Sequence, residues 1–106
     1  MANGDDKNWM RVCMAVDGFR GRYGRWPKRV RIMPICYVDL VSHVLSPIGF
    51  ALVSSFIELV PEDDAEMIAE DDTGATHCYG SHGPGDVVVS PSTYNFFGDA
   101  VLSTTD

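Results

Sequence analysis

A histidine and a cysteine stand side by side in the segment HCYGSH at residues 77–82, and both residue types ligate zinc. In a β-strand, however, adjacent side chains point to opposite faces, so His77 and Cys78 would not reach the same metal ion. A zinc site would need His82 to fold back and a further ligand such as His43 or Asp86. We therefore expect neither a metal nor another cofactor. A zinc-binding protein or an enzyme of unknown type is the third hypothesis, after a module that binds a protein partner and a nucleic-acid-binding accessory protein.

Serine and cysteine side chains are abundant enough to supply a nucleophile, but no motif places a base beside one. The G-x-S-x-G turn is absent, and the glycines of GFRGRYG match neither phosphate-binding fingerprint. Catalytic partners can meet in space from distant parts of a chain, so the absence of a motif leaves an enzyme open. The residues favour a protein without enzymatic activity.

Charge is divided unequally along this acidic chain, whose net charge is −7. All eight Lys and Arg lie between Lys7 and Arg31, so residues 1–31 carry +5 and residues 32–106 carry −12. Half of the positions from 20 to 31 are basic. The basic and aromatic residues of that stretch are Arg20, Arg22, Arg25, Trp26, Lys28, Arg29 and Arg31.

This basic stretch has two interpretations. Its arginines could contact phosphates while Trp26 stacks on a base, which would make the protein a nucleic-acid-binding accessory protein. Alternatively, its cations could form an internal charge clamp, because residues 32–106 contain no Lys or Arg to balance their own acids. The acidic remainder would repel a long polyanion, which favours the clamp. We then expect a basic residue of the stretch to contact a carboxylate from residues 58–72.

A second cluster is acidic and is rich in turn residues. It comprises Glu62, Asp63, Asp64, Glu66, Glu70, Asp71 and Asp72. The spacing does not fit a calcium-binding loop, which alternates oxygen ligands and closes with a glycine and a later Glu. Turn formation explains the Asp residues, and as a surface the cluster would suit a positively charged protein partner.

The periodicity of apolar residues predicts one α+β domain over residues 8–106, after a disordered tail at 1–7. We expect an N-terminal amphipathic helix, a short strand, one or two central helices, and an antiparallel meander of two to four strands. The helices would form a single layer on the sheet. The predicted segments are a helix from Asn8 to the stop at Gly24, a strand at 29–32, helices at 35–45 and 46–53 with Ser46 as cap, and strands within 55–60, 66–71, 75–80 and 87–89. Residues 91–106 read either as a short helical turn or as a loosely packed tail.

Three features of packing follow from these patterns. Trp9, Val12, Val16 and Phe19 form one stripe of the first helix and should be buried together. Val30 and Ile32 should point inward from the first strand, with Arg29 and Arg31 outward. Trp26 and Pro27 should fix the link between helix and strand, with the indole ring over the core.

The segment Tyr23-Gly24-Arg25-Trp26-Pro27, followed by Lys28-Arg29-Val30-Arg31, resembles small uncharacterised bacterial proteins that carry a GRWP-x-RVR segment. The later IAEDDTG segment at 68–74 is similar. The resemblance covers about the first third of the chain and this hairpin, and it implies no activity and no site residues.

The cysteines and the chain ends bear on location. Three cysteines form no even set and no C-x-x-C pair, which is typical of reduced thiols in the cytoplasm. The polar, acidic start MANGDDKN does not read as a secretory signal, and no apolar run is long enough to span a bilayer. We expect a cytoplasmic, non-enzymatic module that binds a protein partner, away from membranes. The sequence fixes neither the partner nor the oligomeric state.

Overall fold

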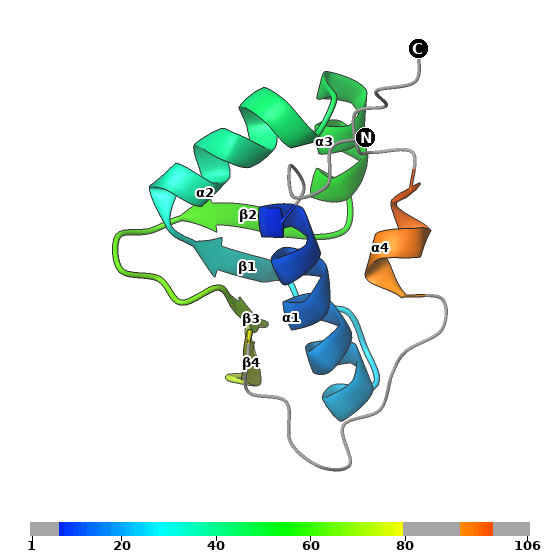
Figure 1. Ribbon diagram of the computed structural model, residues 1–106. Coiled ribbons are helices and arrows are strands. Elements are labelled where there is room, and N and C mark those ends of the chain that lie inside the picture. Colours follow the sequence, from blue (N-terminus) through cyan, green and yellow to red (C-terminus); the bar gives the residue numbers. More distant parts are fainter. Residues whose placement is uncertain (1–6, 80–91, 99–106) are drawn as a thin grey trace.

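The computed structural model describes residues 7–79 and 92–98, and within them it has an α+β fold with a four-stranded sheet (Figure 1). The elements are α1 (Lys7–Tyr23), β1 (Arg29–Ile32), α2 (Pro34–Asp39), η1 (Leu40–Val44), α3 (Pro47–Ser54), β2 (Glu58–Pro61), β3 (Ile68–Glu70), β4 (Thr76–Cys78) and α4 (Thr93–Phe96). The predicted strand at 87–89 and the predicted tail at 1–6 lie outside the described residues. Lys7, assigned to that tail, is instead the first residue of α1.

The sheet is mixed, with strand order β2-β1-β3-β4. β1 pairs in parallel with β2 and antiparallel with β3, and β3 and β4 form an antiparallel hairpin. The predicted strands at 55–60 and 66–71 are therefore not neighbours in a meander, because β1 lies between them. The helices between β1 and β2 return the chain to the end of the sheet at which β1 begins. From there β2 can run parallel to β1.

Helix α1 crosses one face of the sheet and presents the predicted stripe to it (Figure 1). Trp9, Val12, Val16 and Phe19 are all buried, which confirms the helical register. The helix ends at Tyr23, and Gly24 follows with φ of 74°, where its N–H donates to the Arg20 carbonyl at 2.8 Å. A glycine adopts this left-handed conformation without the cost that a Cβ would impose.

The predicted helix at 35–45 is an α-helix that changes to a π-helical turn over η1. The Leu45 N–H donates to the Leu40 carbonyl at 2.8 Å, the i→i+5 bond of that wider turn. The turn allows Leu40, Val44 and Leu45 to be buried together. Ser46 then caps α3 as predicted, accepting from the Gly49 N–H at 2.9 Å.

Of residues 91–106, which the sequence left as a helical turn or a loose tail, the structure describes residues 92–98. Residues 92–98 contain the short helix α4, and Phe97 is fully buried against Trp9 with ring centroids 6.0 Å apart. The Asp17 carboxylate accepts from both the backbone N–H and the hydroxyl of Thr93, at 2.8 and 2.6 Å. This part of the chain is therefore a helical turn attached to α1 rather than a loose tail.

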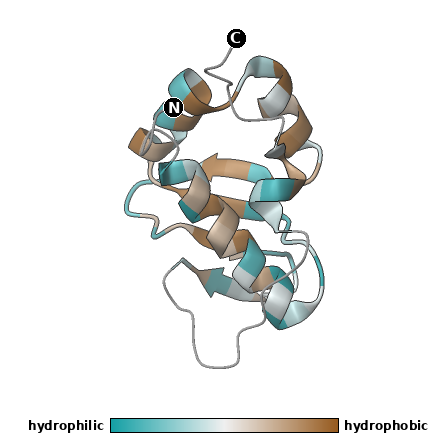
Figure 2. Ribbon diagram, turned by 45° about the vertical axis from the view of Figure 1, so that its right-hand side comes forward, coloured by the Kyte–Doolittle hydropathy of each residue, from teal (hydrophilic) through white to brown (hydrophobic). Residues whose placement is uncertain are grey.

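The core lies between the sheet and its helices, and Figure 2 shows hydrophobic residues along the central strands and the helices that cover them. Val30 and Ile32 are fully buried, whereas Arg29 and Arg31 face outward, which confirms the predicted alternation. Pro27 is buried, and Trp26 is half-buried and packs against the core as predicted.

Candidate interaction surface

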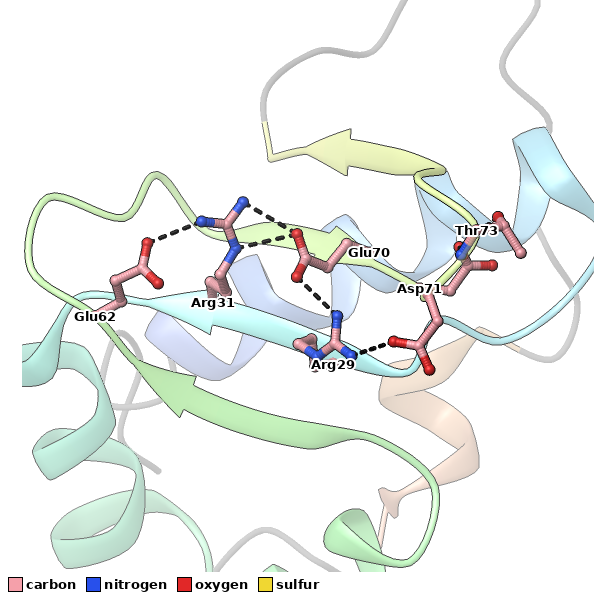
Figure 3. Close-up of polar contacts among 7 residues, drawn as sticks. Arg29, Arg31, Glu62, Glu70, Asp71 and Thr73 are labelled. Carbon is pink, nitrogen blue, oxygen red and sulfur yellow. Dashed lines mark hydrogen bonds and ion pairs between the residues drawn. The ribbon is translucent and has the colours of Figure 1, made fainter.

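The outer face of the sheet carries a network of ion pairs between β1 and the acidic cluster (Figure 3). Arg31 bridges two carboxylates, with Nη1 2.8 Å from Glu62 Oε2 and Nη2 3.0 Å from Glu70 Oε1. Arg29 contacts the other oxygen of Glu70 at 2.8 Å and also pairs with Asp72. Glu70 thus joins both arginines of the strand.

Strand pairing explains why these groups meet. Arg29 and Arg31 are two positions apart in β1, so both side chains leave the same face of the sheet. The register places Glu70 of β3 opposite Arg29, and Arg31 is diagonal to it. The predicted contact between the basic stretch and carboxylates from 58–72 is confirmed.

Hydrogen bonds to the carboxylates stabilise the charged form of both guanidinium groups. The contact with Asp72, followed by that with Glu70, raises the pKa of Arg29 above its ordinary value. Glu62 contributes most to the raised pKa of Arg31. Each positive charge on this face is therefore matched by a neighbouring negative charge.

A third arginine is paired at the turn between β3 and β4. Arg25 reaches Asp71 Oδ2 at 2.6 Å, and the other oxygen of Asp71 accepts from the N–H and the hydroxyl of Thr73 at 2.9 and 2.7 Å. The hydrogen bond from Thr73, followed by that from Arg25, lowers the pKa of Asp71 to about 2. Gly74 follows with φ of 95°, so the predicted DDTG turn is confirmed.

The other cations of the basic stretch have different environments. Arg20 lies over the Trp26 ring, with its guanidinium carbon 4.0 Å from the ring centroid. Arg22 and Lys28 are exposed. The predicted basic patch is thus divided, because three of its arginines contact carboxylates and a fourth lies over an aromatic ring.

The acidic cluster is divided in the same way. Glu62, Glu70, Asp71 and Asp72 pair with arginines. Asp63, Asp64 and Glu66 are exposed in the loop between β2 and β3, and within residues 7–79 and 92–98 they form no ion pair. The loop therefore retains uncompensated negative charge.

Exposed aliphatic side chains form a second feature, which the sequence interpretation missed. Ile35 and Ile48 are 74% and 83% exposed, and Val38, Val41 and Leu52 of the same helical segment are also exposed. For Ile48 and Leu52 a signal was available, because residues 44–53 are apolar almost without interruption, whereas a helix at the surface of a domain buries only one stripe of side chains. Figure 2 shows hydrophobic residues over much of α2 and α3.

An aromatic cluster lies at the link between α1 and β1. Trp26 packs with Phe56 and Phe96 at centroid separations of 5.4 and 5.2 Å, and both phenylalanines are partly exposed. Its members come from three distant segments, so no local pattern could have indicated it.

An open groove lies between α1, the start of α2 and the β2–β3 loop, with a volume of about 210 Å³. Met33 and Met67 provide much of its apolar lining, and Arg11 and Glu66 place opposite charges beside it. The loop backbone here is left-handed at Asp64 and Met67, with φ of 63° and 57°. This conformation is unusual for a residue as bulky as methionine.

The residues that suggested zinc lie on opposite faces of β4, as expected. His77 is buried beneath α1, whereas Cys78 is half-buried on the other face. His82 and Asp86 lie outside the described residues. Within the part of the chain that the structure describes, no three His, Cys, Asp or Glu side chains are grouped to hold a metal ion, and Cys13, Cys36 and Cys78 are free thiols.

No family model, curated protein or solved structure matches this chain. Among the described residues, no helix is both long and apolar enough to cross a bilayer. The functional proposal therefore depends on this chain's own surfaces.

Proposed function

We propose that this chain is a small, non-enzymatic interaction module of the cytoplasm that binds a protein partner through charge-complementary and apolar surfaces. The observation that carries the proposal is the exposure of five large aliphatic side chains on α2, η1 and α3. Burying a side chain of this kind contributes about 1.5–3 kcal/mol, so several together would supply much of the free energy of a protein complex.

Charge supports a positively charged partner. Three arginines already contact carboxylates of the same chain, while the β2–β3 loop keeps exposed acids. A basic partner would gain favourable electrostatic attraction, and an acidic one would be repelled. Nucleic acid is the alternative, for which Arg20 beside the aromatic cluster remains an argument.

The proposal is tested by affinity capture from the native host with three forms of the chain. Ile48→Asp places a charge in the exposed aliphatic surface, and Asn95→Asp adds the same charge on α4 as a matched control. We expect the wild type and Asn95→Asp to retain the same protein partner, and Ile48→Asp to lose it. Equal capture by all three forms, or capture of nucleic acid alone, would contradict the proposal.

A further inference from the structure

The groove between α1, α2 and the β2–β3 loop is bordered by two opposite charges that do not neutralise each other. Arg11 and Glu66 both line it, yet among the described residues neither forms an ion pair. Elsewhere in the described residues, Arg25, Arg29 and Arg31 all contact carboxylates. The two groups at the groove therefore keep their capacity to bind groups from another molecule.

The apolar part of the groove lining suits an apolar side chain. Met33 and Met67 are flexible and polarisable, so they adapt to anchors of different shapes. Met67 is nearly buried although its φ is 57°, and its carbonyl accepts from the Tyr79 N–H at 3.0 Å. That bond ties the carbonyl of the left-handed residue to the end of the β3–β4 hairpin.

The volume of the groove limits the kind of ligand that it can hold. Its volume of about 210 Å³ is below the ~300–1,000 Å³ of small-molecule sites. The space accommodates one or two side chains of a segment that passes across the surface. A whole cofactor-sized ligand would protrude into solvent.

The charged residues at the groove indicate which residue types that segment contains. Glu66 belongs to the loop that also exposes Asp63 and Asp64, so this wall attracts Lys or Arg. Arg11, which also lines the groove, can donate to a backbone carbonyl of the bound segment. Contacts with both Glu66 and Arg11 would therefore restrict how the segment lies in the groove.

We propose that this groove binds an extended peptide segment of the partner protein, in which an apolar anchor residue lies beside a Lys or Arg. The inference rests on the proposed function and names the site and the chemistry of the partner. The anchor packs between Met33 and Met67, and the cation contacts Glu66. The exposed acids at positions 63 and 64 add attraction that salt would weaken.

The test is selection of peptides from a displayed random library with the full chain as bait. We expect the selected peptides to share Leu, Ile, Met or Phe next to Lys or Arg. A synthetic peptide of the selected sequence should shift the methionine methyl NMR signals of Met33 and Met67. A selection without basic residues, or binding that leaves both signals unchanged, would overturn the proposal.

Variants then distinguish the contribution of the Glu66 charge from that of the apolar anchor. Glu66→Gln should raise the Kd of the selected peptide about tenfold at low salt, as should replacing the peptide's basic residue by Gln. Glu58→Gln is the matched control, because Glu58 is also exposed and lies on β2, at the opposite end of that strand from the loop. Equal effects of the two substitutions would overturn the proposed role of Glu66.

Failure of the groove inference can be distinguished from failure of the proposed function. If affinity capture retains a protein partner but no selected peptide binds at the groove, this inference fails and the proposed function stands. If peptides bind as expected but capture yields no protein, the groove is a peptide site and the proposed partner surface on α2 and α3 is wrong.

Discussion

The buried imidazole of His77 occupies the space that a side chain at position 18 would need. A Cβ built on Gly18 would overlap Nε2 and Cδ2 of that ring and lie 2.8 Å from Cε1. His77 is 2% exposed, so other groups surround its ring on nearly all sides. A glycine in the middle of α1 costs about 1 kcal/mol of helix propensity relative to Ala, and here it allows close contact between α1 and β4.

We therefore expect Gly18→Ala to destabilise the fold by about 1–3 kcal/mol, the cost of overpacking, in spite of the better helix propensity of Ala. Urea denaturation would measure the change. Gly98→Ala is the control, because a Cβ there meets nothing within 4 Å. In a double-mutant cycle with His77→Ala, the double variant should be more stable than the sum of the single changes by at least about 0.5 kcal/mol. A strictly additive result would contradict the steric explanation.

The stripe of α1 leads to a second prediction. Phe19 is fully buried and packs on Tyr23 with ring centroids 4.7 Å apart. Phe19→Ala should lower the free energy of unfolding by about 3–5 kcal/mol, the usual cost of removing a buried aromatic side chain. Thermal melting reports the loss, and Met14→Ala on the exposed side of the helix should have little effect. An unchanged melt for Phe19→Ala would contradict the register of α1.

Local patterns predicted the parts of the fold that depend on neighbouring residues. The stripe of α1, the alternation of β1 and the Ser46 cap are set within a few positions of the chain. The insertion of β1 between β2 and β3 depends on pairing between distant segments, which no local periodicity encodes. The contact of Asp17 with Thr93 also joins distant segments, so local periodicity does not predict it either.

The candidate surfaces also differ in whether the sequence alone predicts them. A clamp between the basic stretch and residues 58–72 could be predicted from charge alone, because residues 32–106 contain no Lys or Arg and most of the cations lie at 20–31. The groove could not, since Arg11, Met33 and Glu66 meet through the packing of three elements. The exposure of the aliphatic side chains on α2, η1 and α3 was missed, because the apolar pattern of these segments predicts helices without showing which apolar positions the rest of the fold covers.

The free cysteines lead to a third prediction. Cys13, Cys36 and Cys78 are free thiols, and His77 and Cys78 face opposite sides of β4. We expect a thiol assay on the unfolded chain to count three reactive groups, and a zinc chelator to leave the melting temperature unchanged. Stoichiometric zinc in elemental analysis, together with unfolding on chelation, would show that the sequence reasoning on His77 and Cys78 was wrong.

The clamp on the sheet leads to a prediction about nucleic acid. A labelled single-stranded oligonucleotide at low salt should bind weakly, because Arg29 and Arg31 already contact carboxylates. The variant Arg29→Ala/Arg31→Ala should melt at a lower temperature than the wild type, with a smaller difference at high salt. Lys28→Ala, which removes an exposed cation, is the control. Tight binding that the double variant abolishes without a change in stability would favour the nucleic-acid alternative.

The pH dependence of folding should carry the signature of Asp71. Its pKa in the folded protein is lowered from 3.8 to about 2, chiefly by the hydrogen bond from Thr73 and then by that from Arg25. A lowered folded-state pKa means that the unfolded chain binds the proton more readily. The stabilisation is therefore complete above the unfolded value of about 4 and is lost as the pH falls through about 2.

Asp71→Asn should reduce stability at pH 7 and flatten the stability profile between pH 4 and pH 2. Urea denaturation at several pH values would measure both effects, with Asp63→Asn on the exposed loop as the control. Parallel profiles for the wild type and Asp71→Asn in this range would contradict the role of the turn carboxylate.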